Sequence, residues 1–233
     1  MLEQVGMLWG AASVIVGVGL VVYFNRQDQR VRRRLGRMAT TPVAIAAEGA
    51  KVKIVGTIEY GLNVGKAPLS GRRCAFSSVI VETIGQYGAS EVGREEHGVE
   101  FFVRDESGLV RVMASGHVES ALAPWNGYVV EGVPRERYLK THETACELTE
   151  KVSVRELILT AGTQVAVAGR ARWELASDVG TGYRDNARTL VLYGSESAPI
   201  LVSDDAIVCR SAGSAHEGGW QRLARRRSAG SVA

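Results

Sequence analysis

The sequence predicts an all-β domain, built as a barrel or a sandwich and preceded by an N-terminal transmembrane helix. Residues 5–24 carry no charge, and a helix of that length covers about 30 Å, the thickness of a bilayer core. Beyond Pro42, short runs of Val, Ile and Thr alternate with Gly and polar turns. That spacing is typical of barrels and sandwiches.

The apolar segment is predicted to be a single-pass anchor. A cleaved signal peptide begins with a basic region, whereas only Glu3 precedes this segment. Arginines follow it instead, and the positive-inside rule then predicts an outer N-terminus and a cytoplasmic bulk. We expect these arginines to lie at the lipid surface: Arg26, Arg30, Arg32, Arg33, Arg34 and Arg37.

Small residues share one face of the predicted anchor. Gly6, Gly10, Ser13 and Gly17 follow one another at three- and four-residue intervals, so two such helices can approach closely. The chain itself is therefore a candidate partner within the bilayer. The alternative is that Gly and Ser are simply frequent in membrane helices.

The predicted organisation has five parts. They are a short N-terminus (1–4), the transmembrane helix (5–24), an Arg-rich juxtamembrane helix or linker (25–42), a β domain (43–209) and a basic disordered tail (210–233). In the tail, Trp220, Arg225, Arg226 and Arg227 are candidates for contact with anionic lipid, the alternative being a solubilising tail.

Strands are expected in order along the β domain. The runs are KVKIVGTIEY, CAFSSVIVETI, GVEFFVRDESGLVRVMA, GYVVEGV, LTEKVSVRELIL, TQVAVAGRARWEL and RTLVLYG. The third reads as a hairpin closed by Asp105 to Gly108, with Gly108 in a left-handed conformation. Residues 153–159 are the one stretch that could instead form a short helix, with Ser153 as its N-cap. The longest irregular loop is expected over 176–187.

Charge is concentrated at the ends of the chain. The first 42 residues and the tail from Arg210 each carry a net +4, so the total of +3 leaves −5 for residues 43–209. A nucleic-acid module would carry positive charge on its folded face, so a nucleic-acid partner is disfavoured. The three cysteines form neither a disulfide framework nor a zinc pattern, which fits a reducing compartment.

Few residues suggest chemistry. In APLSGRRC, Cys74 either opens a strand as a small apolar residue or is a reactive thiol whose pKa Arg72 and Arg73 lower. Other candidates are a metal group in THETACE (His142, Glu143, Cys146, Glu147) and an acidic Gly-flanked loop (Glu95, Glu96, His97, Glu100), each set against solvated surface. We predict no catalytic constellation, cofactor or metal site.

Several segments together resemble a known family. KVKIVGTIEYGLNVGKAPLSGRRCAFSSVIVE, VEFFVRDESGLVRV, GTQVAVAGRA and APILVSDDA follow in the order seen in the GIDE domain, also called the BAM (beside a membrane) domain. This domain occurs in the mitochondrial membrane-anchored ubiquitin and SUMO ligase and in prokaryotic relatives. The resemblance implies a β-rich, OB-like module held beside a bilayer, and it makes Arg72, Arg73, Cys74 and Asp105 candidate functional residues.

The chain departs from the ligases of that family. A RING needs eight Cys or His zinc ligands, but only Cys209 and His216 follow Cys146. We therefore expect a membrane-anchored interaction or sensing module with the bilayer and a membrane protein as partners. The alternatives are a member of the E3 ubiquitin ligase family without its RING, or an enzyme that uses a thiol or acid.

Overall fold

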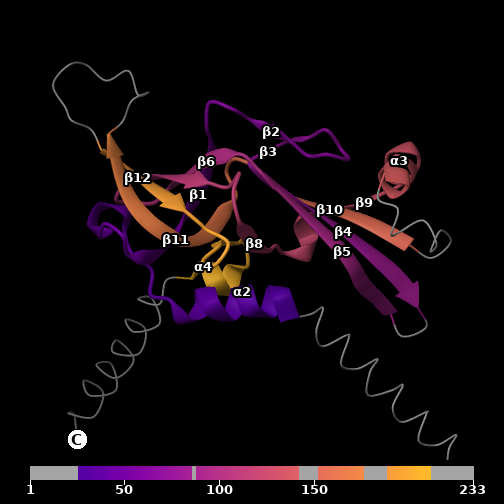
Figure 1. Ribbon diagram of the computed structural model, residues 1–233, viewed down its shortest axis with the longest axis horizontal. Coiled ribbons are helices and arrows are strands. Elements are labelled where there is room, and N and C mark those ends of the chain that lie inside the picture. The colour runs from indigo at the N-terminus through magenta and orange to yellow at the C-terminus, as the bar shows by residue number, and fades with distance from the viewer. Residues whose placement is uncertain (1–25, 86–87, 142–151, 176–187, 211–233) are drawn as a thin grey trace, which may run out of the picture.

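The computed structural model describes residues 26–85, 88–141, 152–175 and 188–210 (Figure 1). Within these ranges no helix has both the length and the apolar character to cross a membrane. Several predictions lie outside the described residues. They are the anchor over 5–24 with its small-residue face, the metal group beginning at His142, the loop over 176–187 and the lipid-contacting tail.

Five strands close into a barrel. They are β1 (Lys51–Tyr60), β6 (Glu100–Arg104), β7 (Leu109–Met113), β11 (Gln164–Leu175) and β12 (Arg188–Tyr193). Numbered along the chain, they pair in the order 1-2-3-5-4-1, and only the β7–β12 pair is parallel. The prediction of a β-rich domain is confirmed, and its closed part is a barrel.

Long β1 makes this closure possible because it serves two neighbours. Residues 51–57 pair with β11 and residues 57–60 pair with β6. Gly56 stands where the two pairings meet, and a Cβ there would lie 2.2 Å from the Arg104 carbonyl oxygen. Val52, Ile54 and Ile58 are buried in the core as the pattern predicted, but Lys53 between them is also buried, so burial does not alternate strictly along β1.

Two further strands and two helices extend the barrel on one side. β13 (Ile200–Ser203) pairs with β11, and β8 (Val118–Ala121) pairs with β13. Helix α2 (Arg26–Arg37) lies across β8 and β13 and contacts α4 (Ala206–Cys209) (Figure 1). The expected juxtamembrane helix is therefore helical from Arg26 to Arg37 and packs directly on the β domain.

A second sheet projects from the barrel in the order β5-β4-β10-β9. Its strands are β5 (Gly88–Gly98), β4 (Phe76–Gly85), β10 (Val152–Leu159) and β9 (Gly127–Val130). Helix α3 (Val133–Thr141) covers one face through Leu139, which packs near Val79 and Val154. Two short 3₁₀ turns, Val43–Ile45 and Pro124–Asn126, complete the connections.

This sheet corrects two expectations, and the helix that covers it was missed. Glu95, Glu96 and His97 were predicted in a loop, but they belong to β5, which pairs with β4 along its length. The helix left open over 153–159 is wrong, because β10 pairs with strands on both sides there and buries Val154. Helix α3 was not predicted, since its apolar residues follow no helical period.

One apolar core joins the two sheets. Phe76, Ile80 and Leu159 of the second sheet pack in the same buried cluster as Phe101 and Leu190 of the barrel. The predicted hairpin is also present, as β6 and β7. Gly108, however, does not have the left-handed conformation predicted for it. It is small because a Cβ would lie 3.1 Å from Val43 Cγ1.

Candidate functional site

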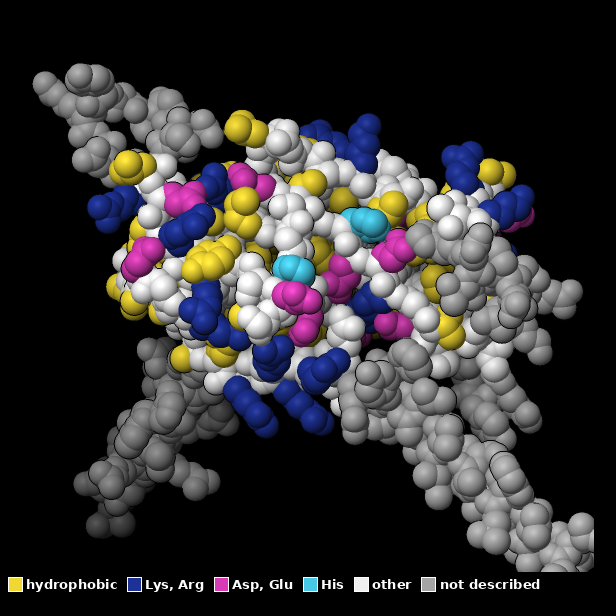
Figure 2. Space-filling view, viewed as in Figure 1, with side chains coloured by type: hydrophobic (Ala, Val, Ile, Leu, Met, Phe, Trp, Pro, Cys, Tyr) yellow, Lys and Arg dark blue, Asp and Glu magenta, His cyan; other side chains and the backbone are white. Residues whose placement is uncertain are grey.

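The surface of α2 is the strongest candidate for contact with a membrane. Val31 and Leu35, one turn apart, are fully buried against the barrel. At 100° per residue, Arg33 and Arg37 project from the opposite side of the helix, where they are exposed. Figure 2 shows Lys and Arg side chains gathered along the lower edge of the molecule, where α2 lies in Figure 1.

Two further arginines of α2, Arg32 and Arg34, form ion pairs with the domain. Arg32 Nε lies 3.3 Å from Asp205 Oδ2, and Arg34 lies 3.3 Å from Glu119. Arg30 is exposed beside the Arg33 and Arg37 positions on the helical wheel. We call Arg30, Arg33 and Arg37 the arginine face.

A buried ion network fixes the N-terminal half of α2. The Arg94 side chain of β5 is only 7% exposed, and its guanidinium lies 2.8 Å from both Asp28 of α2 and Glu91. It also donates to the Ser120 carbonyl. The two carboxylates hold the pKa of Arg94 above its ordinary value despite burial, which acts in the opposite direction. The helix is thus attached to both the barrel side and the second sheet.

A cavity of about 210 Å³ adjoins this network. Asp28, Glu91 and Arg94 line it together with Glu82 and Arg155, which form their own ion pair at 3.5 Å. The carboxylates and guanidinium groups that line the cavity therefore pair with one another. No group of three or more metal-ligating side chains occurs in the described parts of the chain.

The segment APLSGRRC forms the loop that follows β2 (Gly65–Lys66) and ends in β3 (Arg73–Cys74). Glu156 of β10 is fully buried beneath it, and its carboxylate accepts hydrogen bonds from the backbone N–H groups of Leu69 (2.8 Å) and Ser70 (3.0 Å). Gly71 has a positive φ of 68°, a conformation that glycine adopts without steric cost in a tight turn. The loop is therefore fixed by a carboxylate from a distant strand.

The Cys74 side chain is buried in the domain, whereas the Arg72 and Arg73 side chains lie over tyrosine rings. Cys74 is buried at the start of the sheet, and burial raises the pKa of its thiol. The Arg72 guanidinium stacks 3.8 Å above the Tyr128 ring, while that of Arg73 lies 5.6 Å from the Tyr60 ring. These positions favour the apolar interpretation of Cys74 over a thiol activated by its two neighbours.

Asp105 organises the β6–β7 turn. Its Oδ1 accepts from the N–H groups of Ser107 and Gly108, and its Oδ2 accepts from the Val43 N–H at 2.9 Å. Burial raises the pKa of Asp105, but these hydrogen bonds outweigh it, so the pKa lies below its ordinary value. Asp105 therefore has a structural role: it links Val43, at the start of the β domain, to the β6–β7 hairpin.

Glu156 and Arg94 were not singled out from the sequence. Glu156 lies within the stretch 153–159 that was also considered as a helix, and Arg94 directly precedes the acidic candidate stretch that begins at Glu95. The one available signal is a charged residue inside a β-branched run, as in VSVRELIL. Such a residue sometimes faces solvent and sometimes a buried partner, and one strand alone does not distinguish the two.

No known protein family matches this chain, and no curated protein does. The resemblance to the GIDE domain thus stays an expectation that rests on the quoted segments.

Proposed function

We propose that this protein is a single-pass, membrane-anchored interaction module whose β domain is held against the cytoplasmic leaflet. The observation that carries the proposal is the arginine face of α2. It lies opposite the stripe that docks the helix on the barrel, and α2 begins at Arg26, two residues after the predicted anchor ends. A chain emerging from a bilayer there brings this face to the lipid headgroups.

The charge distribution supports the same arrangement. Each basic residue near anionic lipid contributes on the order of 1 kcal/mol, so three arginines on one face give a useful but salt-sensitive attraction. The acidic balance of residues 43–209 disfavours lipid contact through the rest of the domain. We infer that α2 sets the orientation of the domain and leaves the second sheet turned toward the cytoplasm.

The barrel order supports the OB-like part of the proposal, whereas the GIDE type rests on the resemblance of the quoted segments. A five-stranded Greek-key barrel is the hallmark of OB folds, which bind their ligands without a fixed catalytic set. Among the alternatives, a RING-independent ligase or a thiol enzyme finds no support in the surroundings of Cys74. Binding is the function that these residues favour.

Arginine-selective labelling tests the membrane contact in the full chain. The protein is reconstituted into vesicles of phosphatidylcholine alone or with phosphatidylglycerol, labelled with phenylglyoxal and mapped by mass spectrometry. We expect modification of Arg33 and Arg37 to fall several-fold in the anionic vesicles and to recover at high salt, where charge attraction is screened.

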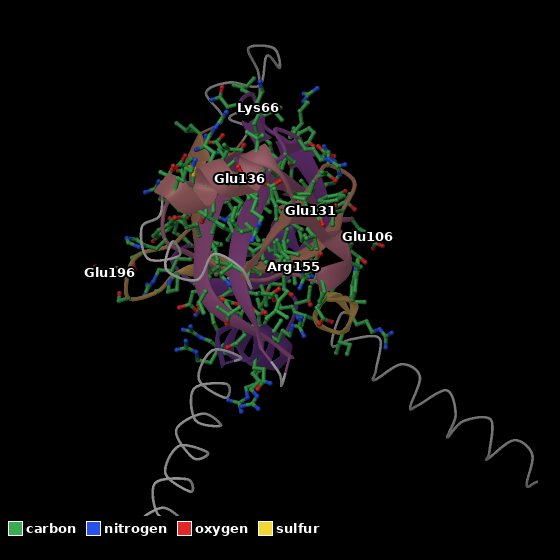
Figure 3. The ribbon with its side chains drawn as sticks, turned by 90° about the vertical axis from the view of Figure 1, so that its right-hand side faces the viewer. Lys66, Glu106, Glu131, Glu136, Arg155 and Glu196 are labelled. Carbon is green, nitrogen blue, oxygen red and sulfur yellow. The ribbon has the colours of Figure 1, made fainter. Side chains whose placement is uncertain are left out.

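Arg137 is the internal control. It is exposed on α3, which lies at the end of the molecule away from α2 (Figures 1 and 3). Its labelling should be equal in both vesicles. Equal labelling of Arg33 and Arg37 in the two lipids would refute the contact, and recovery of the chain outside the vesicle fraction would refute the anchor.

A further inference from the structure

The outer strands of the two larger sheets are protected to different degrees. β8 is covered by α2. β5 carries ionisable side chains at Glu91 and at every position from Arg94 to His97, and a bulge interrupts its pairing beside Val81. Charges and bulges are the usual devices that keep an edge from pairing with another chain. β9, the remaining outer strand, has the sequence GYVV and neither device.

The edge of β9 exposes apolar side chains. Val129 is 61% exposed and Tyr128 41% exposed, with Trp125 and Val133 projecting just before and after the strand. The Gly127 N–H donates to the Pro124 carbonyl instead of to β10. Because successive backbone groups of a strand alternate in direction, the N–H and C=O of Val129 also point away from β10. Among the residues that the structure describes, this donor and acceptor have no strand partner, and they lie on an apolar edge.

A groove borders the same edge. It has a volume of about 320 Å³ and lies between the Pro68–Leu69 turn and α3, where Val133, Pro134 and Tyr138 form its wall. Figure 3 views this end of the molecule, with Glu136 on α3 and Arg155 on β10 below it. A strand added at β9 would place alternate side chains toward this groove and toward Val129 on the other face.

Two chain segments beside the edge are rich in cations, although residues 43–209 as a whole are acidic: Arg72 of one stacks on Tyr128 of β9, and Arg137 of the other lines the groove. The β2–β3 loop and the segment from β9 through α3 carry six cations against two carboxylates. The cations are Lys66, Arg72, Arg73, Arg135, Arg137 and Lys140, and the carboxylates are Glu131 and Glu136. Two copies of this chain meeting edge to edge would bring these like charges together. The charge complements an acidic partner instead.

We propose that β9 is a docking edge for an extended segment of another protein, which adds a strand to the second sheet and carries alternating acidic and apolar side chains. Main-chain hydrogen bonds to Val129 supply affinity, while the groove and the surrounding cations supply selectivity. The proposal deepens the proposed function by naming the surface and the kind of partner. It does not depend on lipid contact by α2.

A defined peptide tests the edge on the full chain in detergent micelles, without lipid. The probe is a fluorescein-labelled heptapeptide of alternating Glu and Val, followed by fluorescence anisotropy. We expect saturable binding, and loss of binding when alternate peptide nitrogens are methylated, since this removes strand pairing but keeps the side chains. A Lys–Val peptide of the same length should bind at least about tenfold more weakly.

Matched variants place the contact on β9. Val129→Lys adds a protective charge to the exposed edge, and Val92→Lys makes the same change at an exposed position on the opposite edge, β5. We expect about tenfold weaker binding for Val129→Lys and unchanged binding for Val92→Lys.

Three results would each overturn the proposal: no binding of the Glu–Val peptide, equal binding of its methylated form, or equal loss in both variants. Self-association that Val129→Lys abolishes would assign the edge to a second copy and overturn it as well. None of these outcomes bears on the lipid-dependent labelling of Arg33 and Arg37, so the two proposals fail separately.

Discussion

At the scale of single residues, burial decides the character of Cys74. Two arginines precede it in the sequence, and cations beside a thiol stabilise the thiolate. In the folded chain those arginines lie over the rings of Tyr128 and Tyr60, and the thiol is enclosed. Arg72 and Arg73 precede Cys74 in the sequence, but their guanidinium groups stack on tyrosine rings and are not placed to stabilise its thiolate.

The two described thiols should therefore react slowly. Burial raises the pKa of Cys74, and it raises that of Cys209 to about 11, with Asp204 acting in the same direction. At pH 7 the thiolate fraction of Cys209 is then far below that of a free thiol. We expect iodoacetamide to modify both residues much more slowly in the native chain than in guanidinium chloride, as measured by mass spectrometry.

The rate should rise with pH, because alkylation follows the thiolate and a raised pKa moves thiolate formation to higher pH. Modification of Cys74 at neutral pH as fast as in the unfolded chain would contradict this picture. It would restore the thiol-dependent enzyme among the functional alternatives.

Charged residues also show the limit of sequence reasoning at this scale. The exposed arginines of α2 were predicted as surface residues, and the described positions Arg33 and Arg37 are exposed. Glu156 was not predicted as a buried carboxylate, because its two donors come from a loop 86 and 87 residues earlier. A pairing over that separation leaves no local pattern.

At the scale of elements, strands with alternating or continuous apolar residues were predictable and others were not. KVKIVGTIEY becomes β1 and RTLVLY becomes β12. β5, with the sequence GASEVGREEHG, has one apolar β-branched residue and four glutamate or arginine side chains, and it is a strand because β4 supplies the partner backbone. Tertiary pairing overrides weak local preference here.

On its barrel side, helix α2 docks through two buried side chains, Val31 and Leu35, which leads to a prediction. Leu35 is fully buried among Ala121, Ala166 and Leu201, whereas its neighbour Gly36 faces open space. Leu35→Ala should lower the free energy of unfolding by about 2–5 kcal/mol, through lost burial and the cavity left behind. Gly36→Ala should raise it by about 0.5–1 kcal/mol, because Ala is the better helix former.

Guanidinium denaturation of the full chain in micelles, followed by circular dichroism, measures both changes. The adjacent pair is its own control, since both substitutions alter the same turn. Equal, small effects of the two would mean that α2 does not dock on the barrel through its apolar side.

At the scale of the whole molecule, the sequence predicted a β-rich domain and the β6–β7 hairpin, but not which of the other strands are neighbours. Barrel closure depends on β1 pairing with β11, more than a hundred residues later, and on the parallel contact between β7 and β12. Neither leaves a sign in the local pattern. The division into a barrel and a projecting second sheet follows from this topology, and with it the exposed edge of β9.

Arg94 connects these parts, because it joins α2 to the second sheet from inside the structure. Arg94→Ala would leave Asp28 and Glu91 without their cation in a largely buried site, so we expect it to lower the free energy of unfolding by about 3–5 kcal/mol. Arg172→Ala is the matched control. It removes an ion pair with Glu174 from a side chain that is 53% exposed, and should cost at most about 1 kcal/mol.

The same experiment tests whether the two sheets unfold together. Trp173 packs against the shared core from the barrel, so its fluorescence reports the barrel in a background where Trp9, Trp125 and Trp220 are replaced by Phe. The backbone signal reports both sheets, so fluorescence and circular dichroism should give one coincident transition with and without Arg94→Ala. Separate transitions in the variant would show that the ion network, and not the shared apolar core, couples the sheets. A loss no larger than that of Arg172→Ala would show that Arg94 does not hold α2 in place.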